Sequence, residues 1–472
     1  MHRTNRPHRL VIALAVAGVL GFTATRAVQA APITGDGVPI DIEQPSLGVT
    51  YLVRTQDPTN IADVGQVVAF AGSVVPGGFA VANGQLLPII DNQVLFSQIG
   101  TTYGGNGINN FALPNLSGRS VVGTGQGAGL TNRPLGSVAG APTQTLTASE
   151  LPPYGGASGV TAGSTPLSTL QPSLALNEGL VAQGFFPVPN GPQAQGPVIG
   201  QVLTYAGSSL PNGQVAANGQ LLPISQNQAL FSVIGNTYGG NSFVNFATPN
   251  LAGREATGAG AAPGLTPQSL GATAGSASTV LTVANLPPQP LTLANGTKAV
   301  VGGGQPINLM QPTLALQYIV AVQGVFPTSQ SIVPDGVPFL GEISLFAGTV
   351  APTGWDFADG QLLSIAANQA LFAVIGTTYG GNGTFEFALP NLEDRIAVGT
   401  GDGVTLGEAF GSDSAYLNFA QLPVGYPAAL PITATVPEPP AIAILLVGLV
   451  GLACRKAARR SGELKEGQGL CP

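Results

Sequence analysis

A stretch of 37 residues occurs three times in this chain, and this repetition constrains the fold more than any other feature. In the three copies, 22 of the 37 positions are identical, and the copies begin 135 and then 141 residues apart. Self-similarity of this kind indicates repeated structural units, and the spacing predicts three modules of ordinary domain size. The copies span residues 83–119, 218–254 and 359–395.

The composition predicts a β-rich α+β fold. Only 8% of the 472 residues are charged, and the chain contains 67 Gly and 40 Pro. Typical soluble domains are about 25% charged, and abundant Gly and Pro favour short strands joined by turns over long helices. We expect each module to contain short strands, glycine-rich loops and one short helix, and we expect one further hydrophobic helix at the C-terminus.

Each copy predicts the same local elements. In the first, residues 65–72 are β-branched and aromatic between glycines, which is typical of a strand. The dipeptide Asn83-Gly84 favours a tight hairpin turn. Over residues 92–99, apolar side chains fall at helical spacing, and Gly100 is placed to end the helix. A helix of two turns is not stable alone, so it must dock on the sheet.

The N-terminus has the pattern of an export signal, with a buried core helix as the alternative interpretation. Residues 1–30 combine a basic start, an apolar run over 10–22, and small residues at Val28 and Ala30. The run is too short to span a bilayer, which predicts a secretory signal removed by signal peptidase. Residues 31–436 contain six Lys or Arg against 19 Asp or Glu, a net charge of −13, which argues against binding to nucleic acid.

The C-terminus carries a second targeting pattern. Residues 440–454 are apolar and are followed by cations, which retain such a stretch at the cytoplasmic side of a membrane. The pattern consists of Pro437, Glu438 and Pro439, the apolar segment, and then Arg455, Lys456, Arg459 and Arg460. A plain C-terminal membrane anchor is the alternative interpretation.

The repeated block resembles the phage tail collar domain, which also occurs in microcystin-dependent-type proteins of bacteria. The third copy carries the fullest pattern, at residues 341–348, 352–355, 359–361, 371–383 and 387–392. The resemblance implies collar units at 61–187, 196–327 and 337–432, after a leader at 31–60. A companion segment that begins Gln-Pro precedes each collar, at residues 44–58, 171–187 and 311–327. This arrangement predicts interlocked units. Because phage collar proteins act as homotrimers, it also suggests an intramolecular pseudo-trimer, with a homo-oligomer as the alternative.

The C-terminal tail, residues 433–460, resembles the PEP-CTERM sorting signal of bacteria that make exopolysaccharide. The resemblance implies that an exosortase cuts near Pro437-Glu438-Pro439 and passes the protein to the cell surface or the extracellular matrix. The chain departs from the usual pattern by continuing for twelve residues, 461–472, after the basic cluster.

The repeated loops are the candidate ligand contacts. Their tyrosine could offer an aromatic face to a sugar, and their asparagine an amide. The structural alternative, which we favour, is that the glycines serve turn geometry and the tyrosines belong to the core. The candidate residues are Tyr103, Asn106, Tyr238, Asn241, Tyr379 and Asn382. The repeated arginines Arg119, Arg254 and Arg395 are interpreted as structural forks that bond loop carbonyls.

Neither a catalytic site nor a cofactor site is predicted. The two histidines, His2 and His8, lie in the signal peptide, and both cysteines lie in the C-terminal tail. Residues 31–436 therefore lack His and Cys for metal ligation or for nucleophilic catalysis. The glycine-rich runs at 123–127 and 399–403 lack the Gly-Lys-Ser/Thr ending of a phosphate loop.

These features favour a non-enzymatic, exported structural or adhesive protein of the cell surface or the exopolysaccharide matrix. One alternative is a carbohydrate-binding adhesin that uses the Tyr-Gly-Gly-Asn loops. A hydrolase of matrix polysaccharide is the least favoured, because it requires paired carboxylates that the sequence spacing does not reveal.

Overall fold

The structure is a computed structural model that describes residues 38–57, 63–151, 167–189, 191–292, 298–330, 332–333 and 337–423. The expected signal peptide, sorting tail, tail extension and C-terminal hydrophobic helix lie outside these residues. Among the described residues, no helix has the length and apolar character needed to cross a membrane.

The three modules contain the same strands and α-helix in the same order, and the first two also have a short 3-10 helix before the α-helix. Three long strands precede the modules as bridges. The first module has β3 (Gln66–Phe70), β4 (Phe79–Val81), β5 (Leu86–Pro88), η2 (Ile89–Asp91), α1 (Gln93–Ile99), β6 (Asn110–Ala112), β7 (Ser120–Gly123) and β8 (Val138–Ala139). The second has β12 (Gln201–Tyr205), β13 (Gln214–Ala216), β14 (Leu221–Pro223), η3 (Ile224–Gln226), α2 (Gln228–Ile234), β15 (Asn245–Ala247), β16 (Glu255–Gly258) and β17 (Thr273–Ala274). The third has β23 (Glu342–Phe346), β24 (Trp355–Phe357), β25 (Leu362–Ser364), α3 (Gln369–Ile375), β26 (Glu386–Ala388), β27 (Ile396–Gly399) and β28 (Ala409–Phe410). The bridging strands are β2 (Ser46–Arg54), β11 (Ser173–Val181) and β22 (Thr313–Ala321).

The expected short helix is confirmed in every module. In α1, Leu95 and Ile99 are buried, and the Phe96 ring lies 5.4 Å from that of Phe111. Gly100 ends the helix with a φ of 55°, and its N–H donates to the Phe96 carbonyl. The helix is therefore held by its apolar face against the module, as its length requires.

The expected hairpin at Asn83-Gly84 does not form. β4 pairs with the bridging strand β2, and β5 pairs with β6. Gly84 still has a positive φ of 77°, and Asn83 forms a bridge with Asn115. The dipeptide thus predicted the local backbone correctly, while both flanking strands find their partners elsewhere.

Each bridging strand joins two modules. In β2, residues 46–49 run parallel to β27 of the third module, and residues 50–53 run antiparallel to β3 of the first. β11 joins β7 to β12 in the same way, and β22 joins β16 to β23. Since β2 lies before the first module and pairs with the last, the pairings close a ring.

The three module strands that follow the bridges also pair with one another. β12 pairs with both β3 and β23, and β23 pairs with β3. The bridging strands are covered on both faces, and every residue of β2 is buried. One continuous apolar core therefore contains residues of all three modules.

Each linker between two modules also contacts the remaining, third module. In the linker that joins the second module to the third, Thr328 accepts a 2.7 Å hydrogen bond from Gly77 N–H of the first. In the linker that joins the first module to the second, Val188 accepts one from Thr353 N–H of the third, at 3.1 Å. Every module is thus held by both of the others.

Glycine at the end of β7, β16 and β27 permits close approach between modules. A Cβ on any of the three would lie about 2 Å from a carbonyl oxygen of the neighbouring module, a distance that sterics forbid. The distances are 2.2 Å from Gly123 to Leu251, 1.8 Å from Gly258 to Leu392, and 1.9 Å from Gly399 to Leu116. Gly123 and Gly399 open the runs that resemble phosphate loops, so packing between modules accounts for these two glycines.

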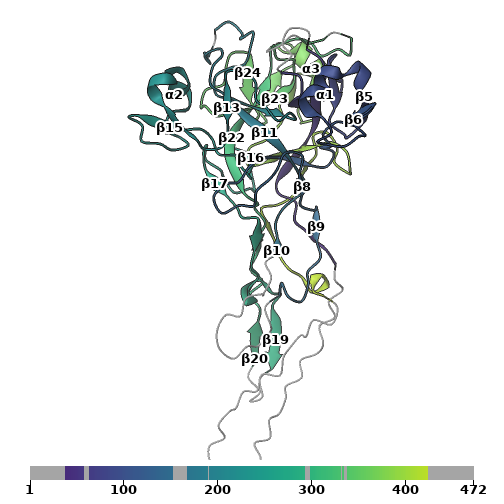
Figure 1. Cartoon of the computed structure of the whole chain (residues 1–472). Coiled ribbons are helices and arrows are strands. Elements are labelled where there is room, and N and C mark those ends of the chain that lie inside the picture. The colour runs from purple at the N-terminus through teal and green to yellow at the C-terminus, as the bar shows by residue number, and fades with distance from the viewer. Residues whose placement is uncertain are drawn as a thin grey trace, which may run out of the picture.

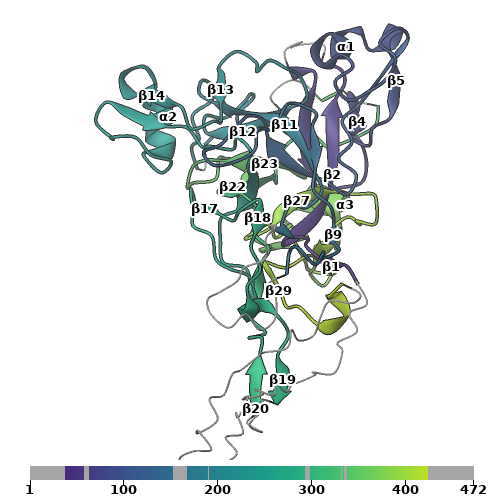
Figure 2. The same ribbon diagram turned by 60° about the horizontal axis from the view of Figure 1, so that its bottom comes forward.

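The molecule has a broad head and a narrow stalk (Figure 1). Turning the view places α1, α2 and α3 at separate corners of the head (Figure 2). In the stalk, the short strand that precedes each bridging strand pairs with a short strand near the end of the module that the bridging strand leads into. These pairs are β1 (Ile40–Asp41) with β9 (Thr143–Gln144), β10 (Leu167–Ser168) with β18 (Ser278–Thr279), and β21 (Ile307–Asn308) with β29 (Ser414–Ala415). The hairpin of β19 (Gln289–Thr292) and β20 (Lys298–Val301) extends further, and short helices η4 (Val283–Asn285) and η5 (Phe419–Gln421) lie beside a separate core of Leu and Ile.

We expect Leu95→Ala in α1 to lower the free energy of unfolding of the whole head by about 2–5 kcal/mol, because the side chain is fully buried. Val94→Ala on the same helix, where the side chain is 39% exposed, is the matched control and should cost far less. Calorimetry should show one head transition that moves to lower temperature. A separate early transition for the first module alone would contradict a shared core.

Candidate functional site

The tyrosines of the repeated loops make hydrogen bonds between modules. Each hydroxyl donates to an alanine carbonyl at the end of a strand in the next module, so the three bonds form a cycle. They are Tyr103 to Ala206 at 2.7 Å, Tyr238 to Ala347 at 2.8 Å and Tyr379 to Ala71 at 3.0 Å. Burial raises the pKa of each phenol. These hydroxyls are therefore engaged in assembling the head.

The asparagines of the same loops hold the backbone. Asn106 Oδ1 accepts N–H groups of Ile108, Asn109 and Asn110, at 3.0, 3.1 and 3.2 Å. Asn241 and Asn382 repeat this pattern in the other modules. Such side-chain to backbone bonds replace secondary structure in a tight loop. The structure brings the six candidate residues together only as pairs, one pair in each module.

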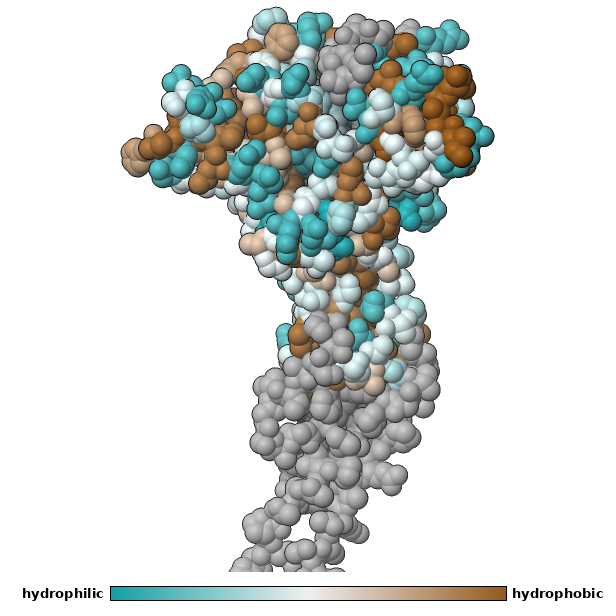
Figure 3. Space-filling view, viewed as in Figure 1, coloured by the Kyte–Doolittle hydropathy of each residue, from teal (hydrophilic) through white to brown (hydrophobic). Residues whose placement is uncertain are grey.

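Apolar side chains are exposed at these loops beside the three asparagines, whereas the three tyrosines are only partly exposed. Ile108 is 85% exposed, Phe243 90% and Phe385 76%. Figure 3 shows apolar patches over β5 and β6 on one side of the head and over β15 at the tip of the opposite arm.

The repeated arginines differ from one another. Arg119 donates to the carbonyls of Asn115 and Ser117, at 3.4 and 3.3 Å. Arg395 donates to Asn391 Oδ1 and to the Glu393 carbonyl, both at 3.4 Å. Arg254 Nη1 is buried without a hydrogen-bond partner among the described residues, and burial lowers the pKa of its guanidinium.

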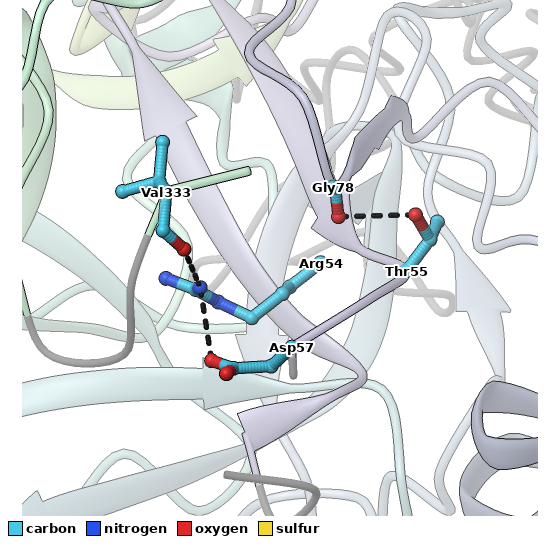
Figure 4. Close-up of polar contacts among 5 residues, drawn as sticks. All are labelled: Arg54, Thr55, Asp57, Gly78 and Val333. Atoms are coloured by element: carbon cyan, nitrogen blue, oxygen red, sulfur yellow. Dashed lines mark hydrogen bonds and ion pairs between the residues drawn. The ribbon is translucent and has the colours of Figure 1, made fainter. Parts of the chain in front are cut away.

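A buried arginine that has no counterpart in the other bridging strands fastens a linker to the first module (Figure 4). Arg54 is 4% exposed, and its Nη1 donates to Asp57 Oδ2 and to the Val333 carbonyl, both at 3.1 Å. The guanidinium carbon lies 4.7 Å from the centre of the Phe79 ring. Paired and stacked in this way, a buried cation is retained. In the equivalent positions β11 has Val181 and β22 has Ala321.

A buried carboxyl group breaks the pattern of the bridging strands at the centre of the head. Tyr51 and Tyr318 donate to carbonyls of Ala397 and Ala256, at 3.2 and 3.1 Å, but the equivalent residue in β11 is Glu178. Its carboxyl oxygens contact the Thr204 hydroxyl at 3.2 and 3.1 Å. Burial raises the pKa of Glu178 to about 8, against the lowering effect of that hydrogen bond.

Glu178 and both tyrosines line a cavity of about 40 Å³. This volume has room for only a few water molecules. Burial likewise raises the pKa of Glu255 to about 8, and Gln171 Nε2 donates to its carboxyl at 3.1 Å. Burial raises the pKa of Glu342 to about 7, while the charge of Arg54 opposes the shift. All three acids are buried, and among the described residues no cluster of three His, Cys, Asp or Glu could hold a metal ion.

Sequence reasoning missed these buried acids, although one signal was available. Aligning the Gln-Pro segments places Glu178 opposite Tyr51 and Tyr318, and a carboxyl opposite two tyrosines marks a position where the copies differ in chemistry.

The comparison with protein families identifies the repeated module. The model of the Phage Tail Collar Domain matches residues 65–121, 200–256 and 341–397. Three segments of the chain are therefore similar to this domain, as the motifs predict, and each match starts at the glycine before β3, β12 or β23. Neither the curated proteins nor the solved structures gave a match to this chain.

We expect Tyr238→Phe to lower the free energy of unfolding by about 1–2 kcal/mol, because the Ala347 carbonyl loses its donor. Tyr416→Phe is the matched control, since that side chain is 66% exposed. Chemical denaturation of both variants measures the difference, and equal midpoints would mean that the bond between modules contributes nothing.

Stability should fall as pH rises from about 4.5 to 8. Between these pH values the folded state keeps a proton on Glu178 that the unfolded chain releases. The raised pKa therefore stabilises the fold at low pH, and this stabilisation is lost as the pH rises through that window. The slope is about 1.4 kcal/mol per pH unit for each such group. We expect Glu178→Gln to reduce this slope by the contribution of one such group. Urea unfolding at pH 5, 6, 7 and 8 measures the slope. Asp91→Asn, at an exposed carboxylate, is the control, and an unchanged slope in Glu178→Gln would refute the assignment.

Proposed function

We propose that this chain is a non-enzymatic structural protein of the bacterial cell surface or exopolysaccharide matrix. In this proposal the three collar domains form a single-chain equivalent of a collar trimer, carried on a stalk. The observation that supports it most is the ring of strand pairings, in which β2 joins the first module to the last. In this ring, each bridging strand pairs with two modules of the same chain, so these pairings do not require a second copy.

The targeting patterns supply the location. The proposed route is export by the signal at 1–30 and sorting by Pro437-Glu438-Pro439 through an exosortase, with a transient membrane anchor at 440–454. The loop tyrosines of the head are engaged in hydrogen bonds between modules. A carbohydrate-binding role therefore requires another surface than those tyrosines.

We expect the protein to reach the cell surface or matrix only when an exosortase is present. A tag inserted at Gly264 allows the protein to be detected in each cell fraction. This position has space for an insertion, because a Cβ built on this glycine meets no atom within 4 Å. Fractionation should show the tagged protein in the matrix in the parent strain and in the inner membrane without the exosortase. The matched control replaces Pro437, Glu438 and Pro439 by alanine and should behave like the strain without exosortase. Soluble protein in the cytoplasm of the parent strain would overturn the proposal.

A second measurement addresses the ring itself. Purified residues 31–436 should be monomeric in sedimentation and should give the scattering curve of one compact head with a stalk. Three separated beads, or a concentration-dependent trimer, would contradict the single-chain proposal.

A further inference from the structure

One interface between modules holds an open cleft. It lies between the second and third modules and has a volume of about 450 Å³, more than ten times that of the central cavity. Small-molecule sites occupy about 300–1,000 Å³. Its walls are residues 258–260 and 268–270 on one side and 357–359 and 392–393 on the other, with Gln317 and Tyr318 of β22 at the base.

An aspartate in an unfavourable backbone conformation fixes one wall. Asp394 has a φ of 54°, where the other copies have Gly118 and Gly253. Left-handed backbone is unfavourable for a residue that carries a Cβ. The Asp394 carboxylate compensates by accepting N–H groups of Ala262 and Gln268, both at 2.7 Å. These charge-assisted bonds hold residues 262–268 of the second module against the third.

Two carboxylates face the cleft without an ion pair. Asp359 is exposed and Glu393 is half-buried, and among the described residues the one ion pair within 4 Å joins Arg54 and Asp57. Burial and then the charge of Asp359 raise the pKa of Glu393, while a hydrogen bond from the Ala261 N–H and the charge of Arg395 lower it. Asp359 Oδ1 accepts the Gln361 N–H at 3.0 Å. A cationic ligand in the cleft would relieve the repulsion between the two carboxylates.

The cleft also offers neutral groups for hydroxyls. Gln317 presents an amide that donates and accepts. Gln268 presents an amide oxygen that accepts, since its Nε2 donates to the Thr266 carbonyl at 3.2 Å. Phe357 presents an aromatic ring. In the equivalent interface of the first and second modules, Thr124 bonds the Asn177 side chain at 2.5 Å. Here Ala259 replaces that threonine, and the bond across the interface is lost.

The other two interfaces have the same backbone but not this chemistry. The positions of Asp359 and Glu393 are Asn83 and Ser117 in the first copy and Asn218 and Ala252 in the second. The carboxylates are therefore a property of one interface and not of the collar domain.

We propose that this cleft binds a saccharide unit that carries a protonated amino group. The ammonium group lies between Asp359 and Glu393, the hydroxyls bond Gln317 and Gln268, and the apolar sugar face rests on Phe357. The choice of a saccharide rests on the proposed matrix location, whereas the need for a cation rests on the two carboxylates alone.

The test compares probes in titration calorimetry with the full mature chain. The probes are a glucosamine tetramer, its N-acetylated counterpart and lysine. We expect the glucosamine tetramer to bind at least ten times more tightly than the acetylated form, and more weakly as salt is added. Lysine should bind less tightly than the tetramer, because it lacks the hydroxyls. Equal binding of the two tetramers, or none, would overturn the proposal, and tighter binding of lysine would overturn the saccharide assignment.

Variants locate the binding. The double variant Asp359→Asn and Glu393→Gln should lose at least tenfold in affinity for the glucosamine tetramer. Its control is Asp91→Asn with Asp402→Asn, which removes the same charge at exposed positions outside the cleft. Equal affinity loss in both double variants would show attraction to net charge and would refute the site. Thermal unfolding checks that both remain folded. A protein that reaches the matrix without binding the tetramer would refute this inference and leave the proposed function standing.

Discussion

The structure depends on how each bridging strand divides its backbone hydrogen bonds. One half of β11 or β22 runs parallel to the module before it, one half of β2 runs parallel to the last module, and the other half of each strand runs antiparallel to the module after it. Backbone N–H and C=O groups must be paired when buried, so neither neighbour completes its sheet without the shared strand. The tyrosine bonds, the close glycines and the crossed linkers all require the separation of modules that these strands set.

Local patterns predicted what is local in this fold. The helix at 93–99 followed from the spacing of Leu95 and Ile99 and from Gly100, since all of its bonds close within one turn. The strand after Gly65 followed from its residue types. The prediction of a hairpin at Asn83-Gly84 was wrong because β4 pairs with β2, which lies before the module, and not with β5. The sequence left two alternatives for Tyr103 and Asn106, a ligand contact or a structural role. It could not identify the hydrogen-bond partner of Tyr103, because the Ala206 carbonyl is 103 residues away.

Linking three copies in one chain lets the copies differ. In a homotrimer, every substitution appears three times around the axis, so a buried carboxyl would face two others. Here Glu178 faces two tyrosines, and Asp394 replaces a glycine in one copy only. Positions that make the bonds between modules stay alike, such as the loop tyrosines, while the cleft beside Asp359 has its own chemistry. None of these differences could be assigned from one copy, because each depends on contacts across an interface.

The pairing of β2 with β27 also sets the order in which the chain can fold. Ser46 pairs with Ile396, so 350 residues separate the two strands of this ladder. Loop closure over such a length costs little more than over a short one, but it cannot begin until the later strand exists. During synthesis from the N-terminus, β2 is made first, and half of its ladder hydrogen bonds cannot form until β27 has been made. The last module to be synthesised therefore completes the first, and the ring of strands cannot close until nearly the whole chain is present.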